Sequence, residues 1–166
     1  MSDAALTALA AEILYREALH LDRREWDAWL AMYAEDAVFW VPSWVEEHEP
    51  ASDPDTQVSL IYHESRFGLD ERIMRIRTRK SVTAMPLPRT QHLIGSVMAR
   101  AEGADAIATD AAFSVEVYDP RTTRAHRNVG RYDHLLRRRG DAWVIARKRI
   151  ILVNDLVPTT LDFYSI

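Results

Sequence analysis

Asp22 and His92 are the two residues of this sequence best suited to acid–base chemistry. His92 lies in RTQHLIGSVMA (residues 89–99), where side chains alternate as they do on a half-buried strand. A histidine oriented by a carboxylate can act as a general base, and a tyrosine beside it can polarise a carbonyl group. The other polar side chains that can line the same pocket are Tyr15, Tyr33, His126, Tyr132 and His134.

Both residues also have structural interpretations. Asp22, with Glu25 three residues later, has the spacing of a capping box at the start of a second helix. A buried histidine on a strand is more often held by a neighbouring carboxylate than used in catalysis, because buried polar groups need partners. We therefore expect no catalytic residue in this chain and an Asp22–His92 contact that joins helix to sheet. A catalytic Asp22–His92 pair is the alternative.

The motifs of metal and nucleotide chemistry are missing from the sequence. It contains no HExxH, GxGxxG, P-loop or GxSxG pattern. It also contains no cysteine, which excludes disulfides, thiolate nucleophiles and cysteine-held clusters. His126 and His134 stand among arginines, which predicts surface or interface positions. We expect no cofactor and no metal ion in this chain.

The elements that must position these residues change in type along the chain. Helical periodicity predicts helices in residues 1–22, 22–33 and 68–78, with Trp26, Trp29, Leu30 and Tyr33 on one face of the second. Short strands are predicted at 37–42 and 57–62, with an acidic surface loop at 43–56 between them. Residues 90–101, 106–118, 123–138 and 141–153 read as long strands joined by short turns. Such a meander predicts an α+β fold, a cone-shaped curved antiparallel sheet with the helices on its concave face.

Size and composition fit one compact domain. The 166 residues are 48% hydrophobic, and neither repeats nor a low-complexity linker divides them, so we expect a single domain over residues 1–166. No leader pattern and no apolar run of membrane-spanning length is present. Together with the absence of cysteine, this favours a cytoplasmic location.

The uneven charge distribution and the apolar C-terminal segment both indicate contacts, either within the chain or with a partner. Residues 1–70 carry 15 acidic and 4 basic side chains, whereas residues 71–166 carry 10 and 17. A nucleic-acid surface, a subunit contact or internal pairing of the two halves can explain this asymmetry. No aromatic-interleaved basic motif supports nucleic acid. The apolar ending LDFYSI (residues 161–166) is predicted either to return as a strand or to pack on a partner.

Several long segments resemble one protein family in the same order along the chain. These segments are LYREALHLDRREWDAWLAMYAEDAVFWVP, RTQHLIGSV, GRYDHLLRRRGDAWVIARKRIILVND and LDFYSI. They are similar to the small (β) subunit of aromatic-ring-hydroxylating dioxygenases, especially the benzoate, toluate and anthranilate branch. The helix-and-cone pattern is shared with the wider group of scytalone dehydratase, steroid isomerase and nuclear transport factor 2.

The resemblance implies a nuclear transport factor 2-like fold and a mainly structural role. It implies a larger α subunit that carries a Rieske [2Fe–2S] cluster and a mononuclear iron, and self-association as a trimer within an α3β3 hexamer. The cysteine-free sequence agrees, because Rieske ligation needs two Cys and two His. In the dehydratase relatives, the positions of Asp22 and His92 belong to the active site. The alternative function is therefore a stand-alone dehydratase or isomerase.

Overall fold

The structure is a computed structural model that describes residues 3–79, 85–154 and 156–166. Its helices are α1 (Asp3–Asp22), α2 (Trp26–Ala31) and α3 (Arg66–Arg77). Its strands are β1 (Tyr33–Pro42), β2 (Trp44–Glu46), β3 (Glu49–Pro50), β4 (Ser59–His63), β5 (Arg89–Ala101), β6 (Ala106–Asp119), β7 (Arg124–Arg139) and β8 (Ala142–Leu152). A short 3-10 helix, Phe163–Ser165, follows.

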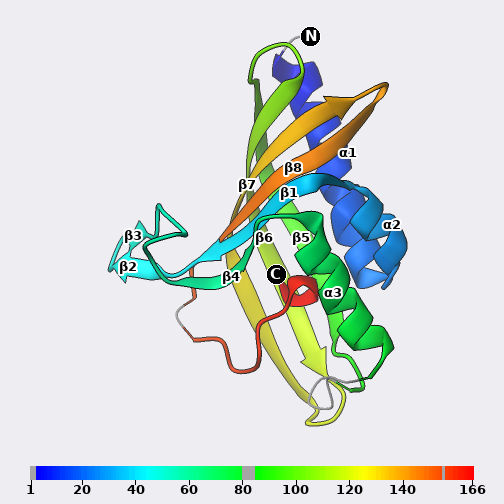
Figure 1. The fold of residues 1–166 in the computed structure, drawn as a ribbon. Helices are drawn as coiled ribbons and strands as arrows, with labels where there is room; N and C mark the ends of the chain where they lie inside the picture. Colours follow the sequence, from blue (N-terminus) through cyan, green and yellow to red (C-terminus); the bar gives the residue numbers. More distant parts are fainter. Residues whose placement is uncertain (1–2, 80–84, 155) are drawn as a thin grey trace.

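Six strands form one long, twisted sheet in the order β4-β1-β8-β7-β6-β5 (Figure 1). The predicted meander is confirmed, because β5 to β8 pair antiparallel with their neighbours in the chain. The expectation of a wholly antiparallel sheet is wrong at one place. Strand β1 runs parallel to β8, with Val38 opposite Arg147, and antiparallel to β4. The sheet is therefore mixed.

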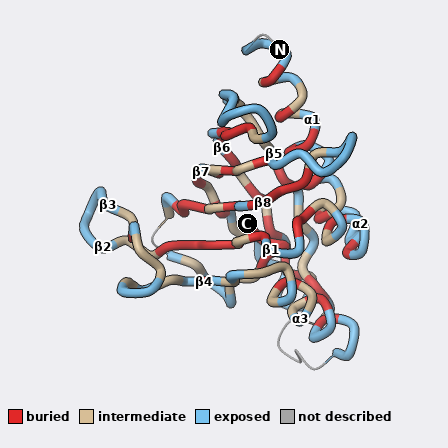
Figure 2. Tube along the Cα trace, turned by 45° about the horizontal axis from the view of Figure 1, so that its top comes forward, coloured by how far each residue is buried: buried red, intermediate tan, exposed pale blue. Residues whose placement is uncertain are grey.

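The three helices lie on one face of the sheet and leave the other face bare of helices (Figure 1). The long strands alternate buried and exposed residues, which places one set of side chains under the helices and the other set outside (Figure 2). Apolar side chains of α1, among them Leu6, Ala10 and Leu14, join the inner faces of the strands in one core cluster. The helix-covered face is called the concave face and the opposite one the outer face.

Helix α2 is shorter than the sequence predicted. It spans Trp26–Ala31, and Tyr33 is already the first residue of β1. The capping-box interpretation of Asp22 is wrong, because Asp22 ends α1 and the N-cap of α2 is Glu25, whose side chain makes no capping hydrogen bond. Trp29 and Tyr33 are nevertheless both fully buried, with ring centroids 5.0 Å apart. The helical periodicity therefore identified Trp29 and Tyr33 correctly as buried, but Tyr33 lies on a strand and not on the predicted helix.

The predicted loop at residues 43–56 contains a two-stranded ribbon of β2 and β3 that projects from the body (Figure 1). Its base is attached to β8 by two hydrogen bonds. Trp44 Nε1 donates to the carbonyl oxygen of Leu152 at 2.8 Å, and Arg149 Nη2 donates to that of Ala51 at 2.8 Å.

The C-terminal segment packs into its own fold, which corrects both expectations for it. It forms neither a strand nor an exposed docking segment, since Phe163 and Ile166 are fully buried. The Phe163 ring stacks on Trp29 with centroids 4.7 Å apart and meets Trp26 edge-on at 5.4 Å. Arg72 of α3 ties the segment down through a 2.8 Å bond from Nη1 to Asp162 Oδ1.

Within the described residues, no helix combines the length and the apolar character needed to cross a membrane.

Candidate functional site

Asp22 and His92 meet at the end of α1. His92 Nδ1 lies 2.6 Å from Asp22 Oδ1, and the backbone N–H of His92 donates to Asp22 Oδ2 at 2.9 Å. Thr90 Oγ1 adds a third hydrogen bond to the same carboxylate at 3.0 Å. All three donors come from β5, so the contact joins helix to sheet as expected.

The electrostatics of this contact favour a charged aspartate. Burial alone would raise the pKa of Asp22, but the side-chain and backbone hydrogen bonds of His92 outweigh it and lower that pKa. The His92 side chain is only 1% exposed, and its Nε2 has no hydrogen-bond partner among the described residues. A carboxylate that orients Nδ1 and leaves Nε2 available is the geometry of a general base. In this structure, however, bulk solvent hardly reaches that base.

A second polar cluster, which the sequence analysis missed, centres on Glu17 in the middle of α1. Glu17 is 2% exposed, and its Oε1 accepts a hydrogen bond from Lys148 Nζ at 2.8 Å. Tyr33 OH and Trp29 Nε1 donate to the same oxygen, the latter at 3.3 Å. The cluster therefore joins α1 to α2, β1 and β8 inside the core.

Mutual charge compensation keeps Glu17 and Lys148 ionised in this cluster. Burial would raise the pKa of Glu17, but the Lys148 ammonium beside it holds that pKa far below its ordinary value. Burial lowers the pKa of Lys148 against the opposing pull of Glu17. The two groups form a buried ion pair whose separation would leave an uncompensated charge in the core.

His134 lies beside this ion pair and not at the surface, so the surface prediction for it is wrong. It is 1% exposed, and its Nε2 is 3.6 Å from Glu17 Oε2, beyond a normal hydrogen bond. Burial lowers its pKa, which favours the neutral ring. Cross-strand pairing places Thr109, His134 and Lys148 side by side on the concave face. The alternation of side chains along β7 could have predicted that His134 is buried, because Tyr132, His134 and Leu136 share one face of the strand.

The other predicted lining residues are dispersed. Tyr33 and Tyr132 are buried in the core, and Tyr132 stacks on Phe113 with centroids 4.1 Å apart. Tyr15 is 51% exposed on the outside of α1 and lines no part of the polar core. His126 is half-buried at the far end of β7. The seven candidates therefore do not converge on one pocket.

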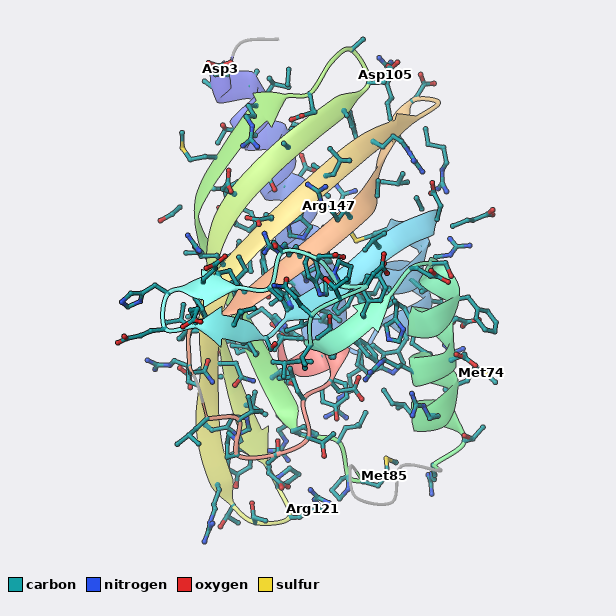
Figure 3. All side chains as sticks on the ribbon, turned by 60° about the vertical axis from the view of Figure 1, so that its left-hand side comes forward. Asp3, Met74, Met85, Asp105, Arg121 and Arg147 are labelled. Carbon is teal, nitrogen blue, oxygen red and sulfur yellow. The ribbon has the colours of Figure 1, made fainter. Side chains whose placement is uncertain are left out.

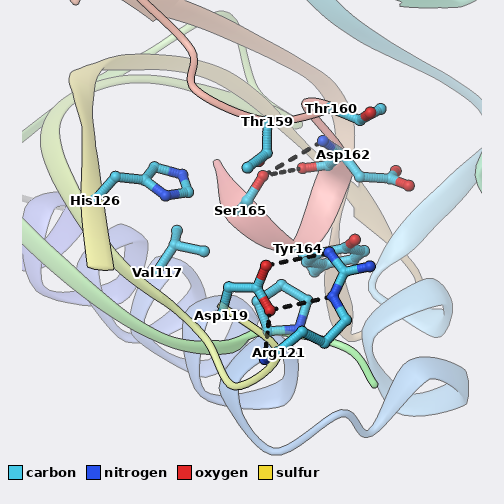
Figure 4. Close-up of a pocket in the computed structure, with 10 residues that line it drawn as sticks. Val117, Asp119, Arg121, His126, Thr159, Thr160, Asp162, Tyr164 and Ser165 are labelled. Carbon is cyan, nitrogen blue, oxygen red and sulfur yellow. Dashed lines mark hydrogen bonds and ion pairs between the residues drawn. The ribbon is translucent and has the colours of Figure 1, made fainter. Parts of the chain in front are cut away.

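A separate cavity of about 350 Å³ opens between the ends of β6 and β7 and the C-terminal segment (Figure 4). Asp119 and Arg121 form its charged wall through bonds of 3.2 Å from Nε to Oδ1 and 3.1 Å from Nη2 to Oδ2. His126 and Tyr164 also line it, and burial raises the pKa of Tyr164 to about 12. The residues that line this cavity do not include Asp22 or His92.

The His, Asp and Glu side chains that could bind iron do not fit an iron cofactor in this chain. A Rieske cluster needs two cysteines and two histidines, and the sequence contains no cysteine. Among residues 3–79, 85–154 and 156–166, no group of three or more His, Asp or Glu side chains is arranged to hold a metal ion.

Comparison with known proteins identifies the family. A family model described as "Ring hydroxylating beta subunit" matches residues 16–159. The anthranilate 1,2-dioxygenase small subunit of Acinetobacter baylyi is 36% identical over 156 residues, which cover 94% of each chain. The crystal structure of the beta subunit of the benzoate 1,2-dioxygenase of Burkholderia mallei is 33% identical, covers 96% of each chain and has a TM-score of 0.79.

The fold is shared more widely than the sequence. A putative scytalone dehydratase of Novosphingobium aromaticivorans has a TM-score of 0.71 at 12% identity and covers 96% of this chain and 95% of its own. This likeness confirms the predicted α+β, nuclear transport factor 2-like architecture, in which a curved sheet carries its helices on the concave face.

Proposed function

Because the chain belongs to the ring hydroxylating beta subunit family, we propose that it is the mainly structural β subunit of a Rieske non-haem iron dioxygenase. In this role it supports a larger α subunit that performs the NADH-dependent dihydroxylation of an aromatic ring. The observation that carries the proposal is the match to β and small subunits over nearly the full length of both chains.

The polar core supports a structural role. The two clusters best equipped for chemistry, Asp22–His92 and Glu17–Lys148, are buried, and each of them joins α1 to the sheet. In this proposal, the Rieske [2Fe–2S] cluster and the mononuclear iron belong to the α subunit, and the absence of cysteine from this chain supports that assignment for the cluster. This chain then contributes no catalytic residue, cofactor or metal ligand.

The proposed substrate class is an aromatic carboxylic acid. The relatives at more than 30% identity reported above belong to dioxygenases of anthranilate and of benzoate, which share a carboxylate on an aromatic ring. We further propose one domain over residues 1–166, a cytoplasmic location and a trimer of this chain within an α3β3 hexamer.

Affinity purification of the tagged chain from a host that degrades aromatic acids tests the proposal. A brown co-purifying subunit of greater mass, with iron and a Rieske-type absorption spectrum, is the expected result. A colourless, iron-free preparation from a host that expresses the large subunit would contradict it. A tagged unrelated protein of the same fold class controls for nonspecific capture.

The Asp22–His92 geometry also favours a second function, that of a stand-alone dehydratase or isomerase. The oriented imidazole supports it, whereas the 1% exposure of the His92 side chain opposes it. If the purified chain alone converted a substrate, and His92→Ala abolished that activity without unfolding the protein, this function would replace the structural one.

A further inference from the structure

The cavity between the ends of β6 and β7 and the C-terminal segment, here called the hairpin cavity, has no part in the proposed structural role. Its volume of about 350 Å³ lies at the lower end of the roughly 300–1,000 Å³ that ligand sites in proteins occupy. Arg121, which lines it, lies in the turn between β6 and β7, at the end of the sheet opposite to Asp105 (Figure 3). The hairpin cavity is therefore large enough for a small molecule with one ring.

Tyr164 brings to this cavity a hydrogen-bond donor that has no protein partner. The residue is 7% exposed, and its hydroxyl group forms no hydrogen bond with any residue that the structure describes. Because burial raises the pKa of Tyr164 to about 12, the hydroxyl group stays protonated at neutral pH and can donate. A buried tyrosine usually finds a partner for this group. An acceptor atom of a bound molecule would supply that partner.

Positive charge surrounds the Tyr164 hydroxyl group. Three guanidinium groups lie close enough to lower its pKa, those of Arg24, Arg72 and Arg121. Two of the three are compensated by carboxylates. Arg72 binds Asp162 at 2.8 Å. Arg121 binds Asp119 at 3.1 Å. These two ion pairs add no net charge to the cavity.

Arg24 carries the charge that no carboxylate compensates. Its Nη2 donates to the carbonyl oxygens of Leu87 at 3.3 Å and Pro88 at 3.2 Å, and it forms no ion pair with a described residue. Pro88 itself lines the hairpin cavity. Three guanidinium groups therefore stand against two carboxylates, an excess of one positive charge near the Tyr164 hydroxyl group. Such an excess favours a ligand with one negative charge.

The wall formed by β6 and β7 offers a flat and largely apolar surface (Figure 4). Val117 of β6 and His126 of β7 are direct cross-strand partners, and both line the cavity. Burial lowers the pKa of His126, which favours the neutral ring at pH 7. This ring forms no hydrogen bond with a described residue. An aromatic ring packs well on such a surface, in stacked or edge-on contact with the imidazole.

We propose that the hairpin cavity binds a small aromatic carboxylate. The ring of the ligand packs on Val117 and His126, and its carboxylate accepts a hydrogen bond from the Tyr164 hydroxyl group. The uncompensated charge of Arg24 attracts the same carboxylate. Thr159 lines the cavity with a hydroxyl group that bonds to no described residue, and it can donate a second hydrogen bond. The choice of an aromatic acid among small monoanions rests on the proposed function.

Isothermal titration of the purified full-length chain with benzoate tests the site. Submillimolar binding is expected, whereas benzamide, which lacks the charge, and acetate, which lacks the ring, are expected to bind clearly more weakly. Tyr164→Phe is expected to weaken benzoate binding by about tenfold or more, because a hydrogen bond to a charged group is lost. Arg24→Gln keeps a donor for the two carbonyl groups and removes the charge. It is expected to weaken the binding of benzoate but not of benzamide.

A matched control and a second blocking variant accompany these substitutions. Tyr118→Phe makes the same chemical change at the same end of β6, but Tyr118 does not line the hairpin cavity, so benzoate binding should stay unchanged. Thr159→Trp fills the cavity from an exposed position and is expected to abolish binding even if Tyr164→Phe destabilises the fold. Circular dichroism verifies that each variant is folded.

The possible results separate this inference from the proposed function. The inference fails if the wild-type chain does not bind benzoate, if Tyr164→Phe and Thr159→Trp bind it like the wild type, or if acetate binds equally well. It also fails if benzoate binds the chain alone but not its assembled complex, because the cavity is then a subunit contact. None of these results affects the dioxygenase role, which co-purification of an iron-bearing subunit tests. If benzoate binds but no such subunit co-purifies, the proposed function fails and the site stands.

Discussion

The carboxylate of Asp22 gathers three hydrogen-bond donors from β5, so its charge state determines how firmly the end of α1 is held there. Because the pKa of Asp22 in the folded state lies below its ordinary value of 3.8, ionisation stabilises the fold above that pH. This contribution is lost as the pH falls from about 3.8 through the folded-state pKa.

Asp22→Asn is expected to lower the free energy of unfolding at pH 7 by roughly 1–3 kcal/mol, since it weakens charge-assisted bonds to a buried histidine. The difference from wild type should shrink as the pH falls below 3.8, because the wild-type carboxylate is then protonated as well. Urea unfolding at pH 7 and at acid pH measures it. Asp141→Asn in the exposed β7–β8 turn is the control, and a difference that does not vary with pH would contradict the assignment.

The Glu17–Lys148 pair predicts strong non-additivity. Lys148→Met alone is expected to cost about 3–5 kcal/mol, because it leaves the Glu17 charge buried without its cation. Glu17→Leu combined with Lys148→Met should cost clearly less than the sum of the single substitutions. A double-mutant cycle from chemical denaturation measures the coupling, and additive losses would show that the pair contributes nothing specific.

At the scale of elements, the C-terminal segment closes the core over α2. Phe163→Ala is expected to cost about 3–5 kcal/mol, since its fully buried ring packs on Trp29 and Trp26. Leu156→Ala, at a side chain that is 85% exposed, is the matched control and should change stability by less than about 0.5 kcal/mol. Similar small losses for both substitutions in thermal unfolding would mean that the segment is not part of the cooperative fold.

Two strand glycines differ in the space around them, which gives a second prediction at this scale. A Cβ added at Gly130 of β7 would lie 2.0 Å from the Ile151 carbonyl oxygen and 2.9 Å from the Phe113 ring, whereas one added at Gly95 of β5 meets nothing within 4 Å. Gly130→Ala should therefore destabilise by at least about 1–3 kcal/mol, because the backbone must shift. Gly95→Ala should be neutral or slightly stabilising. Equal midpoints of urea unfolding would contradict this account.

The elements show how far the sequence could predict the structure. Strands β5 to β8 were predicted within about two residues at each end, because their alternation is long and their turns are short. The capping role of Asp22 was wrong because Asp22 is the last residue of α1, whereas its expected contact with His92 on β5 is present. Glu17 and Lys148 were missed because their contact joins distant segments, and each looks like a surface charge until α1 is placed on the sheet.

At the scale of the whole molecule, the proposed roles of a catalytic α subunit and a structural β subunit predict which variants of this chain leave the turnover rate unchanged. Complexes assembled with His92→Gln are expected to hydroxylate the ring at the wild-type rate per iron, since the His92 side chain is 1% exposed and no chemistry is assigned to it. The amount of assembled complex is expected to fall when the β subunit is destabilised. Activity normalised to iron content measures the first quantity, and the yield of intact complex measures the second. A lower rate per iron at normal yield would assign His92 a part in the reaction.

The parallel pair of β1 and β8 also constrains how the chain reaches its native state. Strand β1 lies inside the sheet between β4 and β8. Val38 can pair with Arg147 only after the chain from β5 to β8 has been synthesised. Until β8 is available, the edge of β1 that faces β8 in the native sheet has unpaired backbone groups. Because β1 is rich in aromatic and branched side chains, such an edge promotes association with other chains. Pairing between such distant segments closes a large loop, which slows folding. A nascent chain of this protein is therefore most exposed to aggregation between the synthesis of β1 and that of β8, and this is the interval in which chaperone protection would raise the yield of folded protein.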